Sequence, residues 1–281
     1  MKKIDIPNFT AQDAYTTCIS IVKDADLKKR LASCANLIVD AENEFKSKIT
    51  KGQIYTISKE KSVNGNVTAK ELEKVYTQRM AKKDVPGRAI YDKLISAPKL
   101  GICPLCSHRL VETLDHYLPK ADFPRLSITP VNLVPSCYTC NKTKLTSSPS
   151  KPEEETLHPY FDDIENDEWL FAVINKTSPP TITYFVRPPV KWSDLLKERV
   201  KYHFSSFSLD KLYSTQAAVL LRNICNRLES IHNSLGIKGV KKYLKEEGES
   251  RYLVDKNSWQ TVFYKTLSID DWFCDGGYKI T

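Results

Sequence analysis

The feature that most constrains this chain is a Cys-x-x-Cys motif that occurs twice, with thirty residues between the two copies. Cys103 and Cys106 form the first pair, and Cys137 and Cys140 form the second. Each such turn directs two thiolates at one position, so two turns supply the four sulfur ligands of a tetrahedral zinc site. A redox pair would need only one of these motifs. Because four thiolates leave zinc no open position, we expect this zinc to be structural and not catalytic.

Several features of the sequence favour a reducing, cytoplasmic setting. The first residues lack the apolar run of a signal peptide, and no stretch approaches 18 uncharged apolar residues. We therefore expect a cytoplasmic protein with no membrane partner. In that compartment, paired cysteines favour a metal over disulfides.

Positive charge is concentrated in the first half of the chain. The net charge is +8 over 281 residues, and residues 1–98 hold 18 Lys and Arg against 12 Asp and Glu. Residues 99–151 hold 7 against 3, whereas residues 152–281 hold 17 against 19. A positive field over the cysteine segment suits a polyanion such as nucleic acid, although a mild basic excess is common in proteins.

Hydrophobic periodicity predicts helices on both sides of the cysteine segment. Before it we expect helices at Ala11–Ile21, Leu27–Ile49, Thr68–Met80 and Arg88–Ile95, with Gln53–Ile57 as a short strand or extended link. Thr68 and Glu71 form a capping box at the start of the third helix. After it, Trp169–Asn175 and Thr181–Arg187 predict a β-hairpin, and residues 191–204, 210–233, 237–247 and 256–266 are expected to be helical.

Between the two cysteine pairs, the chain places polar groups at the ends of short extended segments. Arg109–Leu114 is expected to be a strand, and Pro119 prevents its continuation, so Asp115 and His116 stand where it ends. Asn132 belongs to a second extended segment. A short helix is expected from Cys137 onward, and Asn141 and Lys144, three residues apart, would share one of its faces.

This order of elements and residues resembles the HNH endonucleases, in the zinc-stapled form of their ββα-metal site. The residues that carry the resemblance are the Cys-Pro-Leu-Cys run at 103–106, Leu114-Asp-His116 with a nearby proline, Asn132-Leu133, and Cys140-Asn141 with the lysines that follow. They cover about 45 of the 281 residues. Further details, such as His158-Pro-Tyr-Phe, resemble the HNH proteins found beside ATPases in Septu-type anti-phage systems. That looser likeness implies an ATPase partner.

The resemblance implies a role for each of these residues. His116 would be the general base that activates water, Asp115 and Asn141 would hold a catalytic Mg²⁺ or Mn²⁺, and Asn132 would orient the His116 ring or its loop. Asn141 stands where the family often has histidine, which favours a hard cation with oxygen ligands. Lys142 and Lys144 are placed to contact phosphate. His158 is a further candidate contact to the substrate.

The chemistry of phosphodiester hydrolysis agrees with this set, since it needs a base with a pKa near 7, which histidine supplies, and a cation at the phosphate. DNA is the expected substrate. An RNase of the same fold remains open, because such sites grip the backbone and not the bases. A zinc-knuckle protein that binds nucleic acid or acts as a scaffold without catalysis also remains open.

We therefore predict an α+β protein, mostly helical, built around a central ββα-metal module with a four-cysteine zinc knuckle. The expected domains are a helical region over 1–98, the module over 99–150, and a β-hairpin with a helical region over 151–281.

Overall fold

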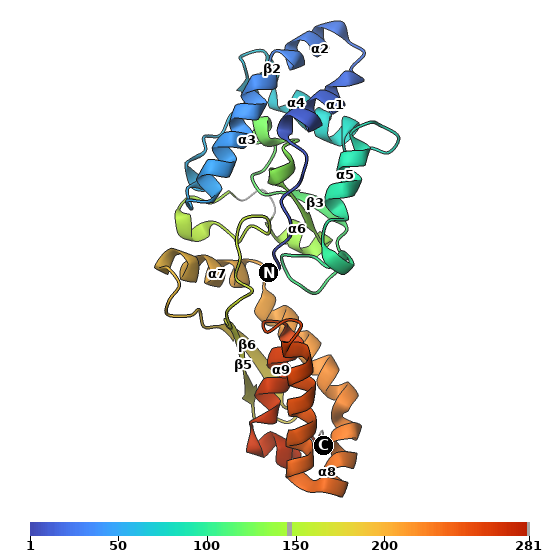
Figure 1. Ribbon diagram of the computed structural model, residues 1–281, viewed down its shortest axis with the longest axis vertical. Helices are drawn as coiled ribbons and strands as arrows, with labels where there is room; N and C mark the ends of the chain where they lie inside the picture. Colours follow the sequence, from blue (N-terminus) through green and yellow to red (C-terminus); the bar gives the residue numbers. More distant parts are fainter. Residues whose placement is uncertain (145–147, 280–281) are drawn as a thin grey trace. The chain divides into compact units, whose positions relative to one another are not determined.

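The fold is known from a computed structural model, which describes residues 1–144 and 148–279. The chain divides into two compact units, Met1–Asp163 and Ile164–Thr281 (Figure 1). Helices predominate, and the strands pair into small antiparallel sheets, which confirms the coarse expectation of a mostly helical α+β protein. The predicted regions 1–98 and 99–150 both fall within the first unit.

The first unit combines helices with two small antiparallel sheets. Its helices are α1 (Ala11–Ser20), α2 (Ala25–Ala32), α3 (Ala35–Ile49), α4 (Ala69–Arg79), α5 (Arg88–Ile95) and α6 (Tyr138–Lys144). Its strands are β1 (Ser62–Val63), β2 (Val67–Thr68), β3 (Thr113–His116) and β4 (Leu133–Ser136), paired β1 with β2 and β3 with β4. The predicted strand or extended link at Gln53–Ile57 is instead a short 3-10 turn, Ile54–Thr56.

One hydrophobic core joins the helices of this unit to the sheet of β3 and β4. It is built from buried side chains of α1, α3, α4 and α5 together with one from each strand: Tyr15, Cys18, Ile38, Leu72, Val75, Ile90, Leu114 and Leu133. Two strands of four residues are marginal by themselves. The helices therefore fix the position of the sheet, and with it the position of Asp115 and His116.

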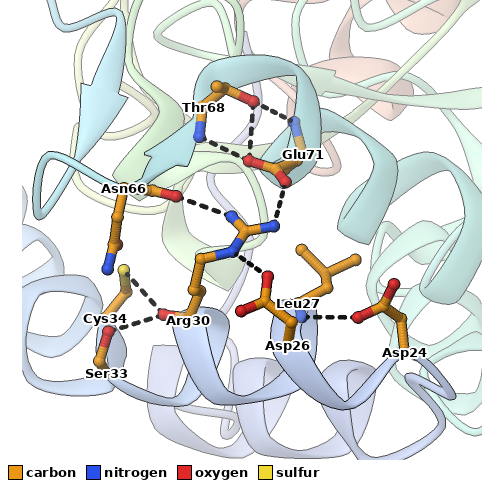
Figure 2. A network of polar contacts seen from close by, with 9 residues as sticks. All are labelled: Asp24, Asp26, Leu27, Arg30, Ser33, Cys34, Asn66, Thr68 and Glu71. Carbon is orange, nitrogen blue, oxygen red and sulfur yellow. Dashed lines mark hydrogen bonds and ion pairs between the residues drawn. The ribbon is translucent and has the colours of Figure 1, made fainter.

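Arg30 connects α2 to the start of α4 (Figure 2). Its guanidinium donates to Asp26 Oδ2 at 2.8 Å, to the Asn66 carbonyl at 2.7 Å and to Glu71 Oε1 at 2.8 Å. Glu71 also completes the predicted capping box with Thr68, which is confirmed. The hydrogen bond from Arg30 is the main reason that the pKa of Glu71 falls to about 2.

The predicted single helix over Leu27–Ile49 is wrong, because the chain breaks between α2 and α3. At the break the Cys34 N–H donates to the Leu31 carbonyl at 2.9 Å, a three-residue turn that ends α2. Leu31, Cys34 and Ile38 are all fully buried across the break. The apolar spacing therefore continues where the helix does not, so the periodicity could not indicate the break.

Gly87 allows α5 to begin close against its neighbours. A Cβ atom at this position would lie 2.7 Å from Cys18 Sγ of α1 and would collide with the Arg79 carbonyl of α4. Only a residue without a side chain fits here.

The second unit pairs a β-hairpin with helices. The predicted hairpin is confirmed as β5 (Leu170–Asn175) and β6 (Thr181–Val186). The helices are α7 (Asp194–Ser206), α8 (Leu209–Tyr252) and α9 (Trp259–Ser268), and α8 lies beside α9 (Figure 1). Gly236, with φ of 63°, interrupts α8 at the place where the sequence predicted the boundary between two helices.

Within residues 1–144 and 148–279, no helix combines the length and the apolar character that crossing a membrane requires.

Candidate metal centre and catalytic cavity

The four cysteines of the paired motifs come together in the first unit. The Sγ atoms of Cys103, Cys106, Cys137 and Cys140 all lie within 4.8 Å of one another, and all four residues are buried. The first pair is shaped by a turn in which the Cys103 N–H donates to the Arg109 carbonyl at 2.8 Å. Four buried cysteines at this spacing could bind a metal such as zinc.

Backbone N–H groups and neighbouring cysteines contact the sulfur atoms of the cluster. The Arg109 N–H donates to Cys106 Sγ at 3.5 Å, and the Cys140 N–H donates to Cys137 Sγ at 3.4 Å. Hydrogen bonding to Cys103 is the main cause that lowers the pKa of Cys137 to about 7 and lowers the pKa of Cys106, whereas hydrogen bonding within the cluster raises the pKa of Cys103 and of Cys140. Buried thiolates need a compensating cation, which a bound metal would provide.

Strand β3 lies slightly later in the chain than the sequence predicted. The expected strand was Arg109–Leu114, but Leu110 instead bridges to Ile102 as part of the cysteine turn, and the strand occupies Thr113–His116. Asp115 pairs with Val134 and His116 with Leu133 of β4. His116 is thus the last residue of the strand, where alternation of side chains ends, and it lines the same cavity as Asp115.

This cavity brings together three of the predicted catalytic residues. It has a volume of about 270 Å³, and its lining includes Asp115 and His116 of β3 and Asn141 of α6. Tyr76, Thr113 and Lys120 also line it. Since one water takes up about 30 Å³, the space holds several water molecules. Asn141 makes one weak contact there, from Nδ2 to Thr113 Oγ1 at 3.5 Å.

The hydrogen bonding of His116 determines which ring nitrogen is basic. Its Nε2 lies 2.8 Å from the Ser127 carbonyl oxygen, which can only accept, so Nε2 carries the proton and Nδ1 carries the lone pair. Burial, aided by the charge of Lys120, lowers the pKa of His116 to about 3. The Tyr76 ring meets the imidazole edge to face, with centroids 4.5 Å apart. The ring is therefore neutral and fixed in orientation, and its lowered pKa departs from the value near 7 that is expected of the general base.

Asp115 is engaged by a lysine in this structure. Lys144 Nζ lies 3.5 Å from Asp115 Oδ2 and donates to the His116 carbonyl at 2.6 Å. Burial raises the pKa of Asp115, and the positive charge of Lys144 opposes that shift. Burial likewise lowers the pKa of Lys144, opposed by Asp115. The predicted contact of Lys144 with phosphate would require this side chain, 9% exposed, to leave its protein partners.

Asn132 holds the loop that follows His116. It is fully buried and does not line the cavity. Its Oδ1 accepts from the Leu118 N–H at 2.8 Å, and its Nδ2 donates to the Leu118 and Leu126 carbonyls at 3.0 Å each. The carboxyamide thus joins both ends of segment 118–126, next to the Ser127 carbonyl that orients His116.

Two further predicted residues lie away from the cavity lining. Lys142 is exposed on α6, with its Nζ 5.9 Å from the centroid of the Tyr138 ring. His158 is fully buried among aromatic rings, with Tyr117 and Phe161 at centroid distances of 4.5 and 5.0 Å. The suggested contact between His158 and substrate therefore does not fit the structure, because aromatic packing places this ring in the core.

Tyr76 and Lys120 belong to the cavity but were not assigned a role from the sequence. Tyr76 comes from α4, about forty residues before the other lining residues, and no motif marks it among the buried positions of that helix. Lys120 belongs to the Asp-His-Tyr-Leu-Pro-Lys run that carries part of the HNH resemblance, and its Nζ lies 5.9 Å from the Tyr76 ring centroid. Its place in that run could have indicated Lys120 as a residue of the site.

The chain is distantly similar to a protein of a bacteriophage. No family model matches the chain, and no solved structure matches it. Protein ea31 of Escherichia phage lambda is 25% identical over 303 aligned residues, which cover 98% of this chain and 100% of the phage protein. At this identity the likeness does not assign a family, and the name of the relative states no activity.

Proposed function

We propose that this protein is a metal-dependent endonuclease of the HNH type that hydrolyses phosphodiester bonds in DNA. The observation that carries the proposal is the single cavity lined by Asp115, His116 and Asn141. A carboxylate, a neutral imidazole and an amide converge there from a strand and a helix of the same small module. The buried cysteine cluster next to them in the chain supports a zinc-stapled form of that module.

His116 would act as the general base. Its Nε2–H is bound to the Ser127 carbonyl, so Nδ1 is the atom that takes a proton from the attacking water. The hydrogen bond and the edge of the Tyr76 ring keep the imidazole from rotating. Fixing the base in this way lowers the entropy cost of reaching the reactive geometry.

Asp115 and Asn141 would supply oxygen ligands to Mg²⁺ or Mn²⁺, which prefer such ligands and keep several waters. A divalent cation held there would stabilise negative charge on the phosphate and on the leaving oxygen. Lys120 lines the same cavity and adds positive charge toward the substrate backbone. Lys142 is exposed on α6 and is available to phosphates farther along the backbone than the one at the cavity.

We assign zinc to the four cysteines as a structural ion. Cys140 is in α6, the helix that also presents Asn141, while Cys137 directly follows β4. A zinc ion there would hold the first cysteine turn, the end of β4 and α6 together. It would thereby set the position of Asn141 relative to β3.

A panel of substrates tests the activity. Purified protein is incubated with plasmid DNA, single-stranded DNA and total RNA, with Mg²⁺, Mn²⁺ or EDTA. We expect cleavage of DNA that needs a divalent ion and is lost in Asp115→Asn. Cleavage of RNA alone would move the assignment to an RNase of the same fold, and cleavage that survives EDTA would remove the metal from the proposal.

A second candidate is a zinc-knuckle protein that binds nucleic acid without cutting it. The observation that favours it is the ion pair between Lys144 and Asp115, which engages the carboxylate that the nuclease needs. Titration with Mn²⁺ separates the two functions. DNA binding in the absence of any Mn²⁺ site that depends on Asp115 would favour the binding protein.

The wider context that the resemblance implies is anti-phage defence together with an ATPase partner. Plaque counts on cells that express the protein, alone or with a neighbouring ATPase, test this context. A defence role predicts fewer plaques with wild type than with Asp115→Asn. Equal counts with and without the ATPase would remove the partner from the proposal.

A further inference from the structure

We infer that Lys144 is a built-in competitor of the divalent metal at Asp115, so that the metal binds strongly only together with the phosphate of the nucleic acid. This inference rests on the proposed nuclease function and adds to it how the site is kept inactive without substrate.

Lys144 places a positive charge directly beside the Asp115 carboxylate. Its Nζ is 3.5 Å from Asp115 Oδ2 and 2.6 Å from the His116 carbonyl, and it lies 5.5 Å from the Tyr117 ring centroid. The side chains of Lys144 and Asp115 are 9% and 7% exposed. An ammonium enclosed in this way is held by a carboxylate, a carbonyl and an aromatic face, the groups that suit a cation.

A divalent cation on Asp115 would face this ammonium at close range. Both positive charges would then share one carboxylate whose side chain is almost fully buried, where like charges repel more strongly than in open solvent. Lys120 adds a further positive charge at the same cavity. The metal must therefore displace Lys144 from Asp115 or be accompanied by additional negative charge.

The balance of charges shows where that negative charge can come from. Asp115 brings one negative charge to this site, Lys120 of the cavity lining and Lys144 beside the Asp115 carboxylate bring two positive charges, and His116 is neutral. A divalent cation adds two more positive charges. Phosphodiester groups of a bound nucleic acid supply negative charge next to the metal, so each ligand should strengthen the binding of the other by the same factor.

The position of Lys144 in the fold makes this competition a property of the folded module. It is the last residue of α6, and Cys140 of the cysteine cluster and Asn141 of the cavity belong to the same helix. The cluster thus fixes the helix that carries both a proposed metal ligand and the competing cation. Exposed Lys142, two residues earlier, does not contact Asp115 in this arrangement and carries no such effect.

Binding of Mn²⁺, followed by electron paramagnetic resonance without turnover, tests the inference. Wild type is compared with Lys144→Met, with Lys144→Arg as the control that keeps the charge, and with Asp115→Asn. We expect Lys144→Met to bind Mn²⁺ about tenfold more tightly than wild type, in the range typical of coupled sites, and Lys144→Arg to remain near wild type. Asp115→Asn should abolish this site.

The same titration with a short DNA duplex tests the coupling without relying on a Lys144 variant. A His116→Ala background prevents cleavage, and we expect the duplex to tighten Mn²⁺ binding about tenfold. The duplex should tighten Mn²⁺ binding by a smaller factor in the double variant that also carries Lys144→Met. Lys144→Met leaves the Asp115 carboxylate buried without a cation, so its folding is checked by circular dichroism. If it does not fold, Lys144→Gln takes its place in the Mn²⁺ titration, together with the duplex titration.

The outcomes separate this inference from the proposed function. Mn²⁺ binding that depends on Asp115 but is the same in wild type and Lys144→Met, and is indifferent to the duplex, would overturn the competition and leave the nuclease proposal standing. Absence of any Mn²⁺ site that depends on Asp115 in every variant would remove the metal from the nuclease proposal, and the competition with it.

Discussion

Replacement of Asn132 by alanine should destabilise the first unit by about 3–5 kcal/mol. The side chain is fully buried and makes three hydrogen bonds, two to the backbone of Leu118 and one to the Leu126 carbonyl. Alanine leaves the Leu118 N–H and carbonyl without this partner, at about 1–3 kcal/mol for each buried group. Loss of the hydrogen bond to the Leu126 carbonyl costs less free energy, because this carbonyl also accepts from the Thr129 N–H at 3.3 Å.

Urea unfolding followed by far-UV circular dichroism measures this loss, with the free energy taken by linear extrapolation. Fluorescence is unsuitable alone, since all four tryptophans belong to the second unit: Trp169, Trp192, Trp259 and Trp272. Asn141→Ala is the matched control, because its one contact is long, and it should change stability by under about 1 kcal/mol. A change for Asn132→Ala as small as that of the control would refute the reasoning.

Three other changes give distinct results. Glu71→Gln should flatten the pH dependence of the free energy of unfolding. The Arg30 hydrogen bond lowers the pKa of Glu71 from 4.5 to about 2. The stabilisation by the Glu71 carboxylate is therefore fully present above pH 4.5 and is lost as the pH falls toward 2. For this partly exposed pair we expect about 1–2 kcal/mol, measured by urea unfolding at pH 5 and 2.5. Gly87→Ala should cost about 2–4 kcal/mol in thermal or urea unfolding, because its Cβ would meet Cys18 Sγ at 2.7 Å. Cys140→Ser should lower the zinc content from about one equivalent per chain toward none and should reduce stability. Elemental analysis measures the zinc, and equal zinc content in wild type and Cys140→Ser would contradict the assignment of zinc to the cysteines.

Local signals in the sequence predicted much of the fold. The capping box of Thr68 and Glu71 and the alternation in the β5–β6 hairpin depend on neighbouring residues, and both appear in the structure as expected. The break between α2 and α3 was missed because burial of Leu31 and Cys34 continues through it. What orients α2 there is the contact of Arg30 with Glu71, forty-one residues away, which periodicity cannot indicate.

For the candidate site too, the sequence indicated some features, while others depend on tertiary contacts. The Cys-x-x-Cys spacing predicted that four sulfur atoms would meet, and they do. The run at Asp115 and His116 indicated the cavity, but Tyr76 of α4 reaches it only through the tertiary core that it shares with Leu114 and Leu133. Likewise, the burial of His158 by aromatic rings and the pairing of Lys144 with Asp115 result from tertiary contacts. Lysine and histidine at such positions look the same in sequence whether they face a substrate or the core.

The most direct test of the account is the rate of plasmid cleavage by wild type and by His116→Ala at saturating Mn²⁺, with His232→Ala of the second unit as the matched control. Loss of the general base should lower the rate about 10²–10⁴-fold, whereas the control should cleave like wild type. Equal metal-dependent cleavage by wild type and a folded, zinc-loaded His116→Ala would contradict the assignment of His116 as the base.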